Sequence, residues 1–184
     1  MKINKLALIS TAICLAGLIV SGCGGEKKPN AKANEPTTYD ATGFLAKAEI
    51  PGAKDVIAVR KDSKDGDDIV VVGRIGGSID PWVEGRAAFS IVDRSLKACS
   101  DDKEDGEPCS CKTPWDYCCE TDKLKDAMVL VKFVESDGKV VKHDARKIFG
   151  IAELETVFVE GKAKRDESGN LTVLASKFYS KPNK

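Results

Sequence analysis

Residues Ala127 to Phe178 carry the strongest fold signal in this chain, and they read AMVLVKFVESDGKVVKHDARKIFGIAELETVFVEGKAKRDESGNLTVLASKF. The stretch begins with a segment rich in branched and aromatic residues, 127–135, and ends with two more, 156–164 and 171–178. Short segments of this composition, bounded by glycine or charge, are typical of β-strands. Between the first strand and the last two, residues 143–154 are expected to hold a short helix despite Gly150.

Two turns support this assignment. Ser136-Asp137-Gly138 leads into residues 139–142 as a hairpin turn, because Asp-Gly tolerates the positive φ that tight hairpins need. Residues 167–170, Glu-Ser-Gly-Asn, separate the last two strands.

Upstream, residues 68–76 (DIVVVGRIG) and 87–92 (AAFSIV) add two strands of the same kind. The order is then three strands, a helical segment and a hairpin, which is typical of the five-stranded OB barrel. Coiled barrel strands need glycine or bulges at their corners, as supplied by Gly73, Gly76, Gly77 and Gly161. The sequence thus predicts a mainly β, five-stranded OB-like Greek-key barrel with a short helix; an open β-sandwich is the alternative.

The N-terminus has the three parts of an export signal. Lys2 and Lys5 are followed by an apolar run, 6–20, whose length is short for a spanning helix, which needs roughly 20 residues. The tetrad 20–23, Val-Ser-Gly-Cys, resembles the lipobox of bacterial lipoproteins. The resemblance implies that residues 1–22 are removed and that Cys23 is acylated, which would hold the protein on a lipid bilayer.

The remaining 162 residues suit one domain and a tether. Residues 23–38 have almost no large apolar side chains and are expected to be flexible, 39–65 helical or irregular, and 66–180 the OB-like domain. Without the signal the chain has 27 basic and 29 acidic residues, so it lacks the basic excess typical of nucleic-acid binding, and we expect no nucleic-acid partner.

A cysteine-rich insertion, residues 99–126, separates the second and third predicted strands. It contains nine acidic and four basic residues and the cysteines Cys99, Cys109, Cys111, Cys118 and Cys119. Because thiols oxidise outside the cytoplasm, disulfides that staple the loop are the first expectation, without any cofactor. Adjacent cysteines are poorly placed to pair with each other, so Cys118 and Cys119 would reach separate partners.

The alternative is a thiolate metal site or a redox-active thiol. Four thiolates suit Zn²⁺, and thiolates also bind Cu⁺. The spacing C-x9-C-x-C-x6-C-C contains no C-x2-C pair, so it does not match a zinc ribbon.

Aromatic residues near these segments are candidates for ligand contact. Trp115 and Tyr117 stand between the cysteines, and Trp82 lies in the loop that joins the first two strands, which borders the ligand face in many OB barrels. The alternative is that these rings form the small core of their loops.

The strings GRIGGSIDPWVEGRAAFSIVD (73–93), SLKACS (95–100) and TPWDYCCE (113–120) resemble a family of uncharacterised secreted or lipid-anchored bacterial proteins with an OB-like domain. The resemblance spans residues 66–178 and depends mainly on TPWDYCC. It implies that Cys99, Cys111, Cys118 and Cys119 form the usual set of four, with Cys109 as a departure.

We therefore expect a membrane-anchored extracytoplasmic lipoprotein, a non-enzymatic module that binds a small molecule, a glycan or an envelope protein. The chain has one histidine, His143, around which no Ser-His-Asp arrangement can be assembled. Gly24 is not the acidic residue that follows the cysteine of inner-membrane lipoproteins, which favours an outer membrane, or else the outer face of the cell membrane.

Overall fold

The computed structural model describes residues 39–101, 103–104, 107–108 and 111–182, which belong to one compact unit. The expected signal peptide, Cys23, the tether up to residue 38, and Cys109 lie outside the described residues. Within the described ranges, no helix is both long and apolar enough to cross a bilayer.

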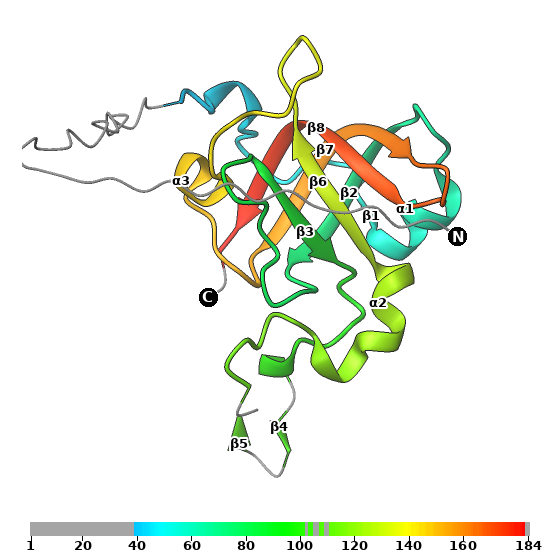
Figure 1. Ribbon diagram of the computed structural model, residues 1–184, viewed down its shortest axis with the longest axis vertical. Helices are drawn as coiled ribbons and strands as arrows, with labels where there is room; N and C mark the ends of the chain where they lie inside the picture. The colour runs from blue at the N-terminus through cyan, green and yellow to red at the C-terminus, as the bar shows by residue number, and fades with distance from the viewer. Residues whose placement is uncertain (1–38, 102, 105–106, 109–110, 183–184) are drawn as a thin grey trace, which may run out of the picture. The chain divides into compact units, whose positions relative to one another are not determined.

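A closed five-stranded barrel forms the body of this unit (Figure 1). Its strands are β2 (Asp68–Ile75), β3 (Ala88–Val92), β6 (Met128–Phe133), β7 (Thr156–Arg165) and β8 (Leu171–Lys181). Neighbours follow in the order β2, β3, β6, β8, β7, and pairing of β7 with β2 closes the ring. β6 and β8 are parallel, while the other pairs are antiparallel. This is the Greek-key order of an OB barrel, so the predicted fold is confirmed and the open sandwich is wrong.

The segment before the barrel adds one short strand and two helical pieces. A 3-10 turn, η1 (Thr42–Phe44), precedes β1 (Lys54–Asp55), which pairs parallel with β2, and α1 (Val56–Asp62) follows directly. Val56 and Val59 of α1 are buried in the barrel core, since residues three apart on a helix share a face.

The core contains a cluster of phenylalanine rings. Phe89, Phe133 and Phe178 come from β3, β6 and β8, with ring centroids 5.6 to 6.3 Å apart. The helix α3 (Ala145–Phe149), between β6 and β7, adds Phe149 at 4.4 Å from the Phe133 ring. Its start is capped by Asp144, whose carboxylate accepts a hydrogen bond from Arg146 N. The short helix expected within residues 143–154 is confirmed.

A bulge in the β7–β8 hairpin accounts for Gly161. The register shifts between Glu160 and Gly161, and a Cβ at Gly161 would lie 2.2 Å from the carbonyl oxygen of Leu174. Only glycine lets the two backbones approach this closely, which is how bulged strands bend in a barrel.

The cysteine-rich insertion projects from one end of the barrel in Figure 1. It contains η2 (Cys99–Asp101), the paired two-residue strands β4 (Lys103–Glu104) and β5 (Glu107–Pro108), η3 (Cys118–Glu120) and α2 (Thr121–Ala127). The helix α2 was not predicted, because its seven residues bury only Leu124 and Ala127 and so carry too little periodicity.

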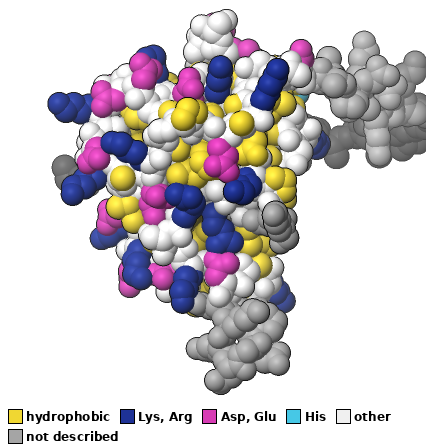
Figure 2. Space-filling view, turned by 180° about the vertical axis from the view of Figure 1, so that it is seen from behind, with side chains coloured by type: hydrophobic (Ala, Val, Ile, Leu, Met, Phe, Trp, Pro, Cys, Tyr) yellow, Lys and Arg dark blue, Asp and Glu magenta, His cyan; other side chains and the backbone are white. Residues whose placement is uncertain are grey.

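On the face seen in Figure 2, basic and acidic side chains are interspersed around hydrophobic ones. Charges of one sign do not dominate that face, in keeping with the balanced composition of the chain.

Candidate functional site

A hydrogen bond joins the two ends of the segment that contains the insertion, and an apolar cluster packs the insertion against the barrel. The connection that contains the insertion leaves β3 at Asp93 and returns to β6 through Ala127, and Asp93 N donates a hydrogen bond to Ala127 O at 2.8 Å. Beside the barrel core, an apolar cluster joins the two ends of the insertion to its centre; its buried members are Val92, Leu96, Ala98, Tyr117, Leu124 and Ala127.

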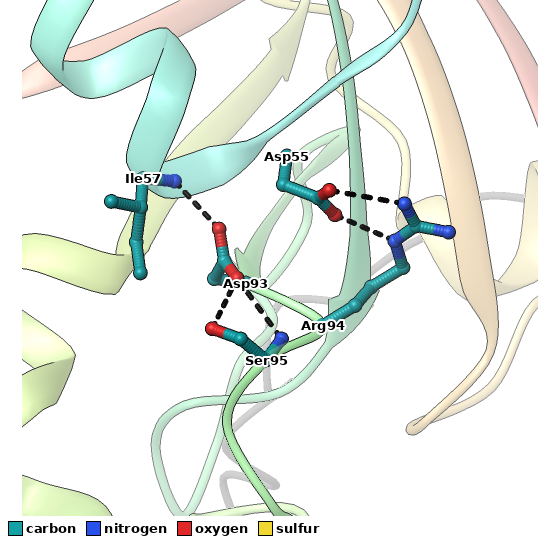
Figure 3. Close-up of polar contacts among 5 residues, drawn as sticks. All are labelled: Asp55, Ile57, Asp93, Arg94 and Ser95. Atoms are coloured by element: carbon teal, nitrogen blue, oxygen red, sulfur yellow. Dashed lines mark hydrogen bonds and ion pairs between the residues drawn. The ribbon is translucent and has the colours of Figure 1, made fainter.

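Asp93 fixes the start of the insertion (Figure 3). Asp93 is 2% exposed as a residue. Its carboxylate accepts hydrogen bonds from Ile57 N at 2.7 Å, Ser95 N at 3.0 Å and Ser95 Oγ at 2.6 Å. Burial acts to raise the pKa of Asp93, but these donors outweigh it and hold the pKa below its ordinary value of 3.8. Alongside, Arg94 donates to both carboxylate oxygens of Asp55, at 2.6 and 3.1 Å.

A second tether joins the barrel to η2. Arg74 of β2 forms an ion pair with Asp101, and the same carboxylate accepts a hydrogen bond from Ala98 N at 3.0 Å. Asp101 therefore fixes the turn that presents Cys99.

The segment Trp115–Tyr117 rests on Gly76 and Gly77 at the end of β2. Gly77 N donates to Trp115 O at 2.8 Å, and a Cβ at Gly76 would lie only 2.6 Å from that oxygen. Tyr117 is fully buried, and its hydroxyl has no hydrogen-bond partner among the described residues. Burial raises the pKa of Tyr117 to about 12. We call this contact the Gly76-Gly77 seat.

Asp116 shapes the turn that carries the paired cysteines. Its carboxylate accepts hydrogen bonds from Thr113 Oγ1 at 2.7 Å and Cys118 N at 2.9 Å, and it lies 3.7 Å from Cys99 Sγ. Tyr117 adopts a left-handed conformation, φ 58°, and redirects the chain into Cys118. On the other side, Cys99 N donates to Pro114 O at 3.0 Å, so both halves of the site share one turn.

The sulfur atoms converge at this turn. Cys118 Sγ lies 2.9 Å from Cys99 Sγ, 3.6 Å from Cys111 Sγ and 3.9 Å from Cys119 Sγ. The sulfurs of Cys99, Cys118 and Cys119 all lie within 4.8 Å of one another, a spacing that could hold a metal ion. Neighbouring sulfurs of a tetrahedral zinc–thiolate site are about 3.8 Å apart when Zn–S is about 2.3 Å. The shortest of the three separations still exceeds an S–S bond of about 2.05 Å.

The four cysteines differ in environment. Cys99 is 1% exposed, Cys111 is half-buried, and Cys118 and Cys119 are exposed. Burial raises the pKa of Cys99 above its ordinary value, and the Cys118 thiol adds to the increase, while neighbouring groups of Cys111, Cys118 and Cys119 oppose it.

The three aromatic candidates have different positions. Trp82 is 7% exposed, donates from Nε1 to Glu153 at 2.6 Å, and has the Arg146 guanidinium 5.5 Å from its ring centroid. Because Trp82 and Tyr117 are buried, neither presents a ring face to a surface ligand, and the expected contact role does not fit them. Trp115 is half-buried and donates from Nε1 to Ile79 O at 3.0 Å.

Sequence reasoning missed the residues that build the site around the cysteines. Asp116, Asp101 and the Gly76-Gly77 seat were not recognised as parts of it. Thr113 and Asp116 lie three residues apart and offer a weak turn signal, whereas the pairing of Arg74 with Asp101 depends on the fold. His143 packs against Tyr39, with ring centroids 4.9 Å apart, and is not in the cysteine group.

No family model matches this chain, and no curated protein matches it. Among solved structures, the chain is similar to one described as "a putative aspartyl-tRNA synthetase from Leishmania major Friedlin". The match has 10% identity and a TM-score of 0.38, and it covers 76% of this chain and 24% of the other. The chain thus spans about a quarter of that protein's length.

Proposed function

We propose that this protein is an OB-like metal-binding module on the outer face of a bacterial membrane, in which the thiolates of Cys99, Cys111, Cys118 and Cys119 bind one Zn²⁺. The observation that carries the proposal is the group formed by the sulfurs of Cys99, Cys118 and Cys119, which lie within 4.8 Å of one another. Cys111 Sγ lies outside this group but 3.6 Å from Cys118 Sγ, and it is the fourth ligand that we propose. The membrane location rests on the signal pattern and the lipobox that ends at Cys23.

Shared contacts favour one ion over two separate disulfides. In a stapled loop each sulfur would have a single partner, and the remaining sulfurs would be free to lie elsewhere. Here Cys118 Sγ has three sulfur neighbours, including that of the adjacent Cys119. One central cation accounts for such a group, because it draws several thiolates to one point.

Four thiolates match the tetrahedral preference of Zn²⁺ and leave the ion without an open coordination position. A zinc site with four protein ligands stabilises structure, whereas a catalytic zinc site keeps one position open for water or substrate. The ion would join η2 to the turn before η3 and so hold the insertion in shape beside the barrel, where it would form part of a surface for a small molecule, a glycan or an envelope protein.

Metal analysis of the intact protein tests the proposal. Protein purified from its own membrane without chelators is expected to contain about one zinc per chain, with the four thiols unmodified until the metal is removed. Replacement of zinc by Co²⁺ should give the thiolate charge-transfer band and the visible bands of a tetrahedral sulfur site. Metal-free protein whose mass is four hydrogens below that of the reduced chain would contain two disulfides and would refute the proposal. Copper at one ion per chain would refute the assignment of Zn²⁺ and identify the bound ion as Cu⁺ instead.

Serine variants identify the ligands. Single replacement of each of the four cysteines should lower zinc affinity by more than the roughly 10- to 100-fold typical of lost outer-shell contacts. Cys109→Ser is the matched control, since it changes a cysteine of the same insertion that the proposal leaves out, and it should retain wild-type affinity. Affinity is measured by competition with a chromogenic chelator, and a loss in Cys109→Ser as large as in the others would contradict the assignment.

A further inference from the structure

We infer that the metal centre is also a redox switch: oxidation by two electrons joins Cys99 Sγ to Cys118 Sγ in a disulfide and releases the ion. This inference rests on the proposed function and adds the regulation of the same site.

Proximity selects this pair. Cys99 Sγ and Cys118 Sγ are 2.9 Å apart, so among the sulfur pairs of Cys118 this one is nearest to the S–S bond length of about 2.05 Å. The other measured partners of Cys118 are farther away, at 3.6 Å for Cys111 and 3.9 Å for Cys119. A bond between Cys118 and Cys119 would also strain the peptide that joins them.

The exposure of the two sulfurs indicates which one reacts with the oxidant and which one then forms the disulfide. Cys118 is exposed and accessible to an oxidant, whereas Cys99 is buried directly against it. An accessible sulfur that is oxidised first and a nearby sulfur that resolves it form the arrangement typical of thiol redox sensors.

The chemistry balances with a hydroperoxide as the oxidant. The Cys118 thiolate attacks the peroxide oxygen, the O–O bond breaks, and one proton is taken up, which gives Cys118–SOH and an alcohol or water. The Cys99 thiolate then attacks the sulfenic sulfur and displaces hydroxide, which leaves as water after protonation. Two thiolates lose their charge in the disulfide, and the remaining two cannot hold the ion tightly, so it dissociates.

Both sulfurs are carried by anchored backbone. Cys99 N is bonded to Pro114 O, and Cys118 N to Asp116. The Gly76-Gly77 seat holds the same turn on β2 through Trp115. Because these bonds involve no cysteine side chain, disulfide formation requires only a local sulfur movement.

The test follows zinc release and disulfide position together. Zinc-loaded full-length protein carrying Cys109→Ser is treated with hydrogen peroxide, release is followed with a chromogenic chelator, and tryptic peptides are mapped without reduction. Cleavage after Lys97, Lys103, Lys112 and Lys123 separates Cys99 on peptide 98–103, Cys111 on 104–112, and both Cys118 and Cys119 on 113–123. We expect release accompanied by a cross-link between peptides 98–103 and 113–123.

Two variants distinguish the sulfurs of the third peptide. Cys119→Ser should still form the cross-link, whereas Cys118→Ser should lose it. Cys99→Ser loaded at saturating zinc should release its metal at least about tenfold more slowly under peroxide, since the resolving sulfur is gone. Zinc that stays bound in the oxidised protein, or a cross-link through peptide 104–112, would refute the redox switch without contradicting the proposed zinc site. Failure to bind zinc before oxidation would refute the proposed function itself.

Discussion

Asp93 accepts a hydrogen bond from a backbone N–H in the first turn of α1, which is the role that an N-cap side chain usually has. The residue before α1, Asp55, makes no side-chain capping bond, and Asp93, 36 positions along the chain from Ile57, accepts the hydrogen bond of Ile57 N instead. The same carboxylate holds Ser95 at the start of the insertion. One buried charge therefore couples α1 to the entrance of the cysteine-rich segment.

Replacement of Asp93 should reveal this coupling in the pH dependence of stability. Asp93→Asn leaves one acceptor oxygen for three donors, and we expect a loss of about 1 to 3 kcal/mol in the free energy of unfolding at neutral pH. Because the pKa of Asp93 is lowered from 3.8, its contribution is complete above about pH 4 and disappears as the pH falls through the folded-state pKa. In urea unfolding from pH 7 to pH 3, the difference in the free energy of unfolding between the variant and the wild type should therefore shrink as the pH falls below about 4.

Asp68→Asn is the control for that experiment. Asp68 is exposed and pairs only with the exposed Lys162 among the described residues, so its loss should cost under about 1 kcal/mol. A constant difference between wild type and Asp93→Asn at all pH values would show that the Asp93 charge does not contribute.

Gly76→Ala should loosen the contact between barrel and insertion. The added Cβ would meet Trp115 O at 2.6 Å and Tyr117 Cε2 at 3.0 Å, and overpacking of this kind typically costs 1 to 3 kcal/mol. We expect a lower melting temperature and weaker zinc binding in the same variant. Gly43→Ala is the matched control, because no neighbouring atom lies within 4 Å of its Cβ position. Equal melting temperatures for the two variants would argue against the seat.

At the scale of elements, the insertion and the barrel have separate sources of stability. The barrel strands bury a continuous core around Phe89, Phe133 and Phe178. Among the described residues, the insertion is held by a small apolar cluster, the two carboxylate tethers, the Gly76-Gly77 seat and the sulfur group. Small segments with so little core are typically held by disulfides or a metal.

Removal of the metal should therefore loosen one element and spare the other. After chelation under reducing conditions, we expect faster amide exchange at residues 111–127 and little change in β2, β7 and β8, because local opening is confined to the segment that has lost its ligand. Hydrogen exchange with mass-spectrometric detection gives the comparison, and added zinc should restore protection. Equal acceleration in the barrel strands would mean that the two elements unfold together.

At the scale of the whole molecule, the proposed membrane location depends on a single residue, Cys23. Cys23→Ser removes the thiol to which the lipid would be attached, and without acyl chains the protein should leave the membrane. We expect the wild type in the detergent-rich phase after phase separation and the variant in the aqueous phase. Cys14→Ser, which changes the other cysteine of the N-terminal region, should partition like the wild type. Wild-type protein found in the aqueous phase would contradict the anchor.

The limits of prediction differ among the parts of the molecule. The five barrel strands were predicted within a few residues, and α3 lies within the segment predicted to hold a helix, since each has a local pattern of composition and turn residues. The two-residue strands β4 and β5 of the insertion were not predicted. The helix α2 was missed. For Trp82 and Tyr117 the sequence left ligand contact and a place in the core of their loops as alternatives, and both side chains are buried. Aromatic residues in loops follow no helical or strand periodicity that would predict which side chains are buried. Their burial depends on the segments that pack over them.

The sequence by itself determined the barrel order and the set of cysteines in one insertion, because each of these follows from local composition or spacing. The export signal is a prediction from the same kind of local pattern. Only the tertiary structure decided which groups meet. It brings Asp93 to Ile57 and Arg74 to Asp101. It also gathers Cys99, Cys111, Cys118 and Cys119 at one turn, resting on the Gly76-Gly77 seat of β2. Such contacts join residues up to 38 positions apart, as in the hydrogen bond between Gly77 and Trp115, and their geometry is set by the closed barrel and the packing of the insertion, for which no local pattern exists.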